Sequence, residues 1–235
     1  MRIRIKTFFN RVQTAGFTLV ELLVTISIFA LVTGIVMFNQ GRFNSTIFLT
    51  NLAYDVSLAI RQAQTYGVNV RHFNKNLGPG LDANTFDAPY GVHFNSKDNT
   101  HFVMFGDIIN DGYLSQNNLD GAPPIEEGDF MSAEHFCSEH YECVRVYVIK
   151  NNSYIKEFSV KNSLGGEFVS SANEFDTLDI TFERPDPDAV IRFTKNGDEV
   201  ADIVSATIVF SSTDDPDALR YVNVTSTGQI SAARE

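Results

Sequence analysis

The first 38 residues divide into a basic stretch and an uninterrupted apolar stretch. Residues 1–16 carry four basic residues and no acidic one, whereas residues 17–38 are uncharged except for Glu21. A helix over residues 17–38 would span roughly 33 Å, enough to cross the hydrocarbon core of a bilayer. The run is longer than a signal-peptide core, and no small-residue cleavage site follows it in Asn39–Arg42. We therefore expect a retained single-pass membrane helix, with its basic leader in the cytoplasm and the body of the protein outside.

Helical periodicity continues beyond this apolar stretch. Between residues 49 and 66, apolar side chains recur every three or four positions, as on one face of an amphipathic helix. Gly67 stands where helices commonly end, at the C′ position. The pattern predicts one helix from Phe17 to Tyr66, in which residues 39–67 continue the membrane helix and pack on a domain. The apolar face consists of Leu49, Leu52, Ala53, Val56, Ile60 and Ala63.

Beyond Val68 the apolar positions alternate with a period of two, which is typical of strands. Residues 91–94 and 101–105 flank a polar turn and predict one hairpin, and residues 144–150 and 154–160 predict another. Further strands are expected at 178–182, 190–193, 206–210 and 221–225, and long loops at 74–89 and 110–136. About eight short strands without a second helix predict an antiparallel β head over residues 68–235. The expected fold class is α+β, with a long N-terminal helix packed on this head.

Composition and charge exclude several classes of protein. A hydrophobic share of 43% with 20 phenylalanines is incompatible with a disordered chain. The net charge is −11, and residues 17–235 hold 14 basic against 29 acidic residues, a net of −15. Because such a body repels phosphate, nucleic-acid binding is disfavoured. Two cysteines are too few for a disulfide scaffold.

The junction Gly16-Phe17-Thr18-Leu19-Val20-Glu21, between the basic leader and the apolar run, resembles the processing site of type IV prepilins. The resemblance implies that a prepilin peptidase cuts between Gly16 and Phe17 on the cytoplasmic face, and that the new N-terminal Phe17 is then methylated. It also implies the pilin architecture, in which the membrane helix is the assembly element. The remaining partners would be other pilins or pseudopilins and the inner-membrane assembly platform.

Glu21 matches the glutamate that this family carries at the fifth residue after the cut. A carboxylate near the start of a membrane helix is costly unless it is paired, so it suggests function. The cut leaves a cationic amine on Phe17, which Glu21 of a neighbouring subunit could neutralise in lipid. The structural alternative is a glutamate that reaches the interface from the first helical turn, where the helix dipole favours it.

Two further stretches resemble the GspH/FimT group of minor pseudopilins and pilins. They are the helix exit, residues 60–70, and the segment 224–230, which is similar to that group's last strand and its glycine turn. This resemblance favours a minor subunit of a type IV pilus or of a type II secretion pseudopilus.

Two clusters could carry other chemistry. Cys137 and Cys143 are close in sequence, so a disulfide is expected outside the membrane, with zinc held by both cysteines, His135 and His140 as the alternative. Asp107, Asn110 and Asp111 are weak candidates for calcium, because their spacing is not that of a calcium loop and an Asp-Gly turn explains them. We expect no metal and no cofactor.

Catalysis has little support in the sequence. The five histidines lie outside any recognised catalytic frame, and His93 and His101 are expected to be exposed strand positions. The leading hypothesis is therefore a non-enzymatic structural subunit. The alternatives are a pilin-framed binding module, which recognises a surface, an exoprotein or DNA, and a signal-anchored envelope protein.

Overall fold

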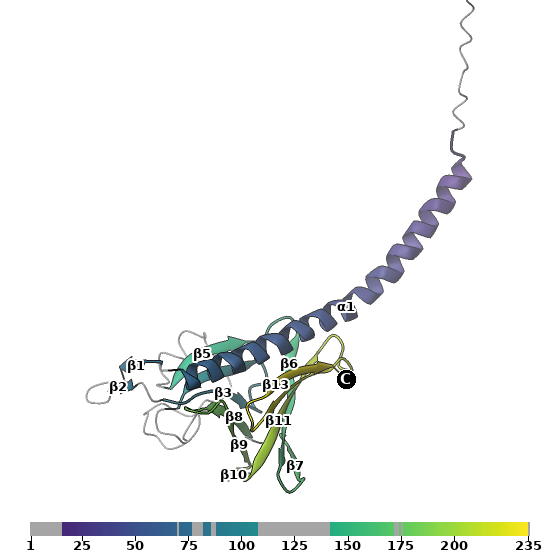
Figure 1. The fold of residues 1–235 in the computed structure, drawn as a ribbon. Helices are drawn as coiled ribbons and strands as arrows, with labels where there is room; N and C mark the ends of the chain where they lie inside the picture. The colour runs from purple at the N-terminus through teal and green to yellow at the C-terminus, as the bar shows by residue number, and fades with distance from the viewer. Residues whose placement is uncertain are drawn as a thin grey trace, which may run out of the picture. The chain divides into compact units, whose positions relative to one another are not determined.

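The computed structural model describes residues 16–69, 71–76, 82–85, 88–107, 142–171, 174 and 176–234 (Figure 1). The chain divides into two compact units, Met1–Gly41 and Arg42–Glu235. The second unit is called the head below. The predicted cysteine, histidine and calcium-site residues between 108 and 141 lie outside the described residues.

The helix α1 runs from Leu19 to Val68 and is the helix that the apolar pattern predicts. It includes Gly67, so the prediction of Gly67 as the C′ residue is wrong. The reason for a glycine there is a close approach of two backbones: a Cβ at Gly67 would lie 2.1 Å from the carbonyl oxygen of Phe182.

The first sheet of the head contains six antiparallel strands in the order β10-β9-β8-β3-β4-β5. Their bounds are Tyr90–Asn95 for β3, His101–Gly106 for β4, Cys143–Val148 for β5, Thr177–Phe182 for β8, Ala189–Lys195 for β9 and Asp198–Glu199 for β10. The predicted hairpin at 91–105 is confirmed as β3 and β4, in which Tyr90 faces Gly106.

The second sheet contains five antiparallel strands in the order β13-β12-β11-β6-β7. Their bounds are Ser153–Asn162 for β6, Glu167–Val169 for β7, Ile203–Ser212 for β11, Arg220–Thr225 for β12 and Ile230–Arg234 for β13. A separate pair, β1 (Phe73–Asn76) and β2 (Asp82–Thr85), lies mostly in the stretch 74–89. The prediction of a plain loop over that stretch is therefore wrong.

The second predicted hairpin, residues 144–160, is also wrong, because its two strands belong to different sheets. β5 pairs with β4 in the first sheet, whereas β6 pairs with β11 and β7 in the second. Ile149 and Ile155 donate backbone hydrogen bonds to the carbonyls of Thr100 and Asn99 instead of pairing with each other. These bonds to the β3–β4 turn separate the strands, so the intervening Asn151-Asn152 turn leads the chain from one sheet to the other.

A single apolar cluster joins the second half of α1 to both sheets. Burial of these side chains is the main force that holds the helix on the head, since apolar burial contributes about 25 cal/mol per Å². The α+β fold class, with an apolar N-terminal helix and antiparallel sheets, is confirmed. The fully buried members of the cluster include Leu49 and Ile60 from α1, Tyr90, Phe94, Phe182 and Phe193 from the first sheet, and Phe158 and Phe210 from the second.

Candidate functional site

The start of α1 is stabilised by a side-chain cap. α1 begins directly after Thr18, whose Oγ1 accepts a hydrogen bond from the backbone N–H of Glu21 at 3.2 Å. Thr18-Leu19-Val20-Glu21 has the Thr-x-x-Glu spacing of a capping box, in which the side chain at the helix start satisfies an otherwise unpaired N–H. The spacing is legible in the sequence, although the capping box was not among the predicted features. Glu21 thus stands in the first turn, where a carboxylate also interacts favourably with the helix dipole.

The segment Leu19–Met37 of α1 is apolar and exposed on every side. Its mean hydropathy is 2.4, and none of it is buried against the rest of the chain. Thr25 and Ser27 donate their hydroxyl hydrogens to the backbone carbonyls of Leu22 and Leu23, at 2.8 Å each. These hydroxyls therefore bring no unsatisfied donor into an apolar medium. By length and composition the segment can cross a membrane.

A second exposed apolar surface lies on the part of α1 that belongs to the head. Phe43, Ile47, Tyr54 and Leu58 are 68%, 42%, 62% and 66% exposed. Their spacings of four, seven and four residues align them along one side of the helix. We call these four residues the outer stripe. The opposite side of α1 supplies the buried face of the core, including Val56 and Ile60.

Sequence reasoning found the buried face of α1 but not the outer stripe. The signal was present as a second set of apolar positions at helical spacing. An exposed apolar row of this kind commonly marks an interaction site. The stripe is therefore the part of the head's helix that has the properties of a contact surface.

The end of α1 is fixed to the turn between β12 and β13. Gln64 Nε2 donates to the carbonyls of Pro187 and Gly228, at 2.9 and 3.0 Å, and Arg61 donates to the carbonyl of Ile230 at 3.2 Å. Gly228 has a φ of +76°, and a Cβ there would lie 2.0 Å from the carbonyl oxygen of Pro187. The two stretches that carry the GspH/FimT resemblance are thus in direct contact.

Comparison with known families identifies the N-terminal segment. A family model described as "Prokaryotic N-terminal methylation motif" matches residues 11–37, which include Gly16, Phe17 and Glu21. The chain carries the N-terminus of a type IV pilin-like protein. Together with the apolar helix, the motif fits a membrane-anchored prepilin. Searches of the curated proteins and of the solved structures gave no match.

The other predicted site residues do not form a site in the described part of the chain. Asp107 is fully buried, and its Oδ2 lies 3.3 Å from Nη1 of Arg192. Cys143 is buried at the start of β5, and the disulfide to Cys137 and the zinc alternative remain predictions. Within the described ranges, no three His, Cys, Asp or Glu side chains gather as metal ligands would.

The expectation of an exposed His93 is wrong. His93 is buried, and its Nδ1 lies 2.6 Å from Oδ1 of Asp179, which is also buried. Asp179 stands directly opposite both His93 on β3 and Arg192 on β9, so the three side chains emerge on the same face of the sheet. The alternation of apolar and polar residues in the sequence suggested that His93 faces solvent. However, β3 and β8 are central strands whose side chains are buried on both faces of the sheet. His101, in contrast, is partly exposed beside Asp98.

Burial raises the pKa of the Asp179 carboxyl, since desolvation penalises the charged form more than the neighbouring His93 and Arg192 stabilise it. His93, Asp179 and Arg192 lie on β3, β8 and β9 of the first sheet, and none of them belongs to the outer stripe. We therefore assign them to the stability of the head and not to the assembly surface.

Proposed function

We propose that this chain is a minor structural subunit of a type IV pilus or a type II secretion pseudopilus. A prepilin peptidase would cut between Gly16 and Phe17, and Phe17 would then be methylated. The processed chain would stay in the inner membrane, with its N-terminus on the cytoplasmic side and its head outside, until it enters a filament. No enzymatic activity is expected.

The observation that carries this proposal is the exposed apolar surface of α1 on both sides of residue 41. The segment Leu19–Met37 is matched by the methylation motif and is unburied, and the outer stripe provides apolar surface on the head's part of the same helix. In lipid, helices associate by close packing and by polar contacts between helices. In water, the outer stripe would gain in addition from burial of its apolar area. One helix thus has surfaces suited to helical partners in both media.

The polar contact proposed for the membrane part joins Phe17 and Glu21. The cut creates an ammonium group on Phe17, which is costly in lipid without an anion. Glu21 of a neighbouring subunit would supply that anion and so fix the axial position of one subunit against the next. The hydrogen bond from the Glu21 backbone to Thr18 leaves the carboxylate available, because it uses only the N–H group.

The basic leader supports the proposed orientation. Four basic residues and no acidic one precede the apolar segment, and such an excess of positive charge stays in the cytoplasm. The assignment as a minor subunit rests on the GspH/FimT resemblance. The contacts of Gln64 with the Gly228 turn support it, because they give the two resembling stretches one structural role, the attachment of the helix to the head.

The substitution Glu21→Gln tests the assembly role. It removes the charge and nearly preserves the shape, so membrane insertion and cleavage at Gly16 should persist. Breaking a buried ion pair commonly costs about 3–5 kcal/mol, so the variant should be excluded from filaments. The measurement is the ratio of filament-bound to membrane-bound protein at equal expression.

Asp55→Asn is the matched control, because it removes one carboxylate from an exposed position of α1 within the head. It should leave the ratio unchanged. A Glu21→Gln ratio equal to that of the wild type would remove the assembly role proposed for the Glu21 carboxylate.

A further inference from the structure

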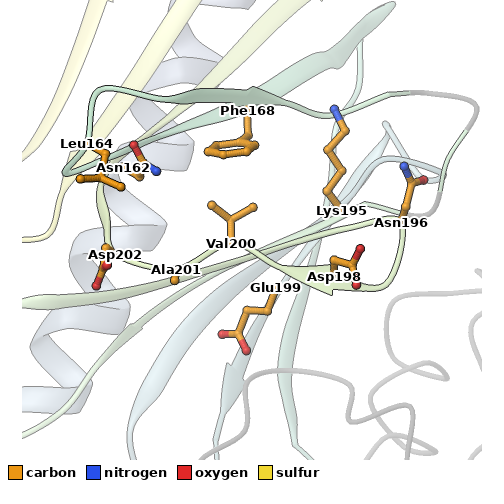
Figure 2. Close-up of a pocket in the computed structure, with 10 residues that line it drawn as sticks. All are labelled: Asn162, Leu164, Phe168, Lys195, Asn196, Asp198, Glu199, Val200, Ala201 and Asp202. Carbon is orange, nitrogen blue, oxygen red and sulfur yellow. The ribbon is translucent and has the colours of Figure 1, made fainter.

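A groove separates the edges of the two sheets in the head. It has a volume of about 520 Å³ and lies between the β6–β7 hairpin and the β9–β10 hairpin (Figure 2). Figure 2 shows Phe168 and Val200 facing each other across it, with Lys195 at one end and Leu164 at the other. We call it the edge groove. Its lining also includes Asn162, Asn196, Asp198, Glu199, Ala201 and Asp202.

Both strands that border the edge groove are the last strands of their sheets. β7 ends the five-stranded sheet and β10 ends the six-stranded sheet, so among the strands that the structure describes each has a neighbour on one side only. The N–H of Val200 bonds to the carbonyl of Phe193, which makes this pair a hydrogen-bonded one. In an antiparallel ladder the adjacent residue, Glu199, then directs its N–H and C=O away from β9. These outward groups are what an added extended chain would bond to.

The side chains of the edge groove combine apolar surface with an excess of acid. Leu164 is 87% exposed, the highest value among the large apolar residues that the structure describes. Lys195 donates to the backbone carbonyl of Val169 at 2.8 Å, so its ammonium group already has an acceptor across the groove. Asp198 and Glu199 are exposed and negatively charged. The groove is therefore complementary to a segment that carries both apolar and basic side chains.

The position of the edge groove makes it separate from the assembly surface. In Figure 1, β7 and β10 lie at the edge of the head farthest from the part of α1 that belongs to the head. The outer stripe, on that part of α1, therefore does not cover this edge.

We propose that the edge groove binds an extended polypeptide segment in which basic and apolar residues alternate. The segment adds as a short strand beside β10, through the backbone of Glu199. Alternate side chains then point to opposite sides, so the apolar ones meet Leu164, Phe168 and Val200 on one side, while the basic ones meet Glu199 on the other. This role is a binding function, additional to that of a structural subunit, and does not depend on filament assembly.

Fluorescence anisotropy with the full processed chain in lipid nanodiscs tests the proposal. The probe is a fluorescein-labelled octapeptide of alternating valine and lysine. It should bind saturably, whereas the same peptide with N-methylated backbone amides, or with glutamate in place of lysine, should not. Equal binding of the N-methylated peptide would overturn strand addition, and absence of saturable binding by the valine–lysine peptide would overturn the proposal entirely.

Variants of exposed residues locate the binding without risk to the fold. Leu164→Lys and Glu199→Lys should each weaken binding by about fivefold or more, as loss of a favourable surface contact together with a new like-charge repulsion predicts. Glu183→Lys makes the same change of charge at an exposed position outside the groove, and it should alter binding by less than about twofold. If Glu183→Lys weakens binding as much as Glu199→Lys, the peptide is attracted by the overall charge and the edge groove is not its site.

Discussion

The substitution Gly67→Ala sets a gain in helix propensity against a steric clash, and the structure says which is larger. Alanine in place of a helical glycine contributes about 1 kcal/mol by propensity alone. At Gly67, however, the new Cβ would lie 2.1 Å from the carbonyl oxygen and 2.8 Å from the carbonyl carbon of Phe182, against an ordinary minimum of 3.0 Å. The obstructing atoms belong to the backbone of β8, a central strand, so they cannot rotate away as a side chain would.

Relief of this clash requires the end of α1 to move from the sheet by about 1 Å, and overpacking of this kind typically costs about 1–3 kcal/mol or more. Because a backbone is the obstacle, we place the cost at the upper end and expect a net loss of about 2 kcal/mol. For a unit of this size each kcal/mol lowers the melting temperature by about 2–4 °C, so a decrease of about 4–8 °C is expected.

Circular dichroism of the detergent-solubilised full chain measures this change, and the absence of tryptophan makes it preferable to tryptophan fluorescence. Gly34→Ala is the control, since a Cβ there meets nothing within 4 Å, and it should leave the melting of the head unchanged. An unchanged or raised melting temperature for Gly67→Ala would refute the close packing of α1 on β8.

Two further predictions concern the outer stripe and the buried carboxylate. Leu58→Lys should lower the filament-bound fraction without lowering the melting temperature, because Leu58 is 66% exposed. The control Val204→Lys, at a 40% exposed strand position, should leave both quantities unchanged. Incorporation of the Leu58 variant equal to that of the wild type would show that the outer stripe is not part of the assembly surface. Burial raises the pKa of Asp179, so the folded state holds the carboxyl proton more tightly than the unfolded chain does. The stability that this proton provides is complete below the unfolded pKa of about 3.9 and is lost as the pH rises through the raised pKa of the folded state. Melting curves between pH 4 and 8 should therefore show the wild type losing stability relative to Asp179→Asn, and the opposite trend would mean that the contact with His93 lowers the pKa of Asp179.

The parts of the fold that the sequence predicted are those set by local pattern. The apolar run, the helical face at Leu49–Ala63 and the β3–β4 hairpin each depend on side chains close together in sequence. The prepilin junction is equally local, since its residues act through their order along the chain.

The parts that could not be predicted depend on contacts between distant segments. The 144–160 segment has the alternation of a hairpin, yet Ile149 and Ile155 bond to the β3–β4 turn and separate its strands. His93 occupies a regular strand position, and only its place in the strand order puts it against Asp179. β10, with two residues, is too short to give any periodic signal, so the edge groove beside it was also invisible in the sequence.

The most direct test of the pilin-like account is the N-terminus of the protein as it exists in the membrane. The processing proposed from the methylation motif would give a product that begins at Phe17 and carries a methyl group on its amine. Intact-mass and N-terminal peptide mass spectrometry of membrane-extracted protein measure both features at once. We expect a methylated Phe17 N-terminus that is lost when the prepilin peptidase is absent. An N-terminus after Phe38, or an uncut chain in a cell that processes other prepilins, would contradict the assignment as a pilin-like protein.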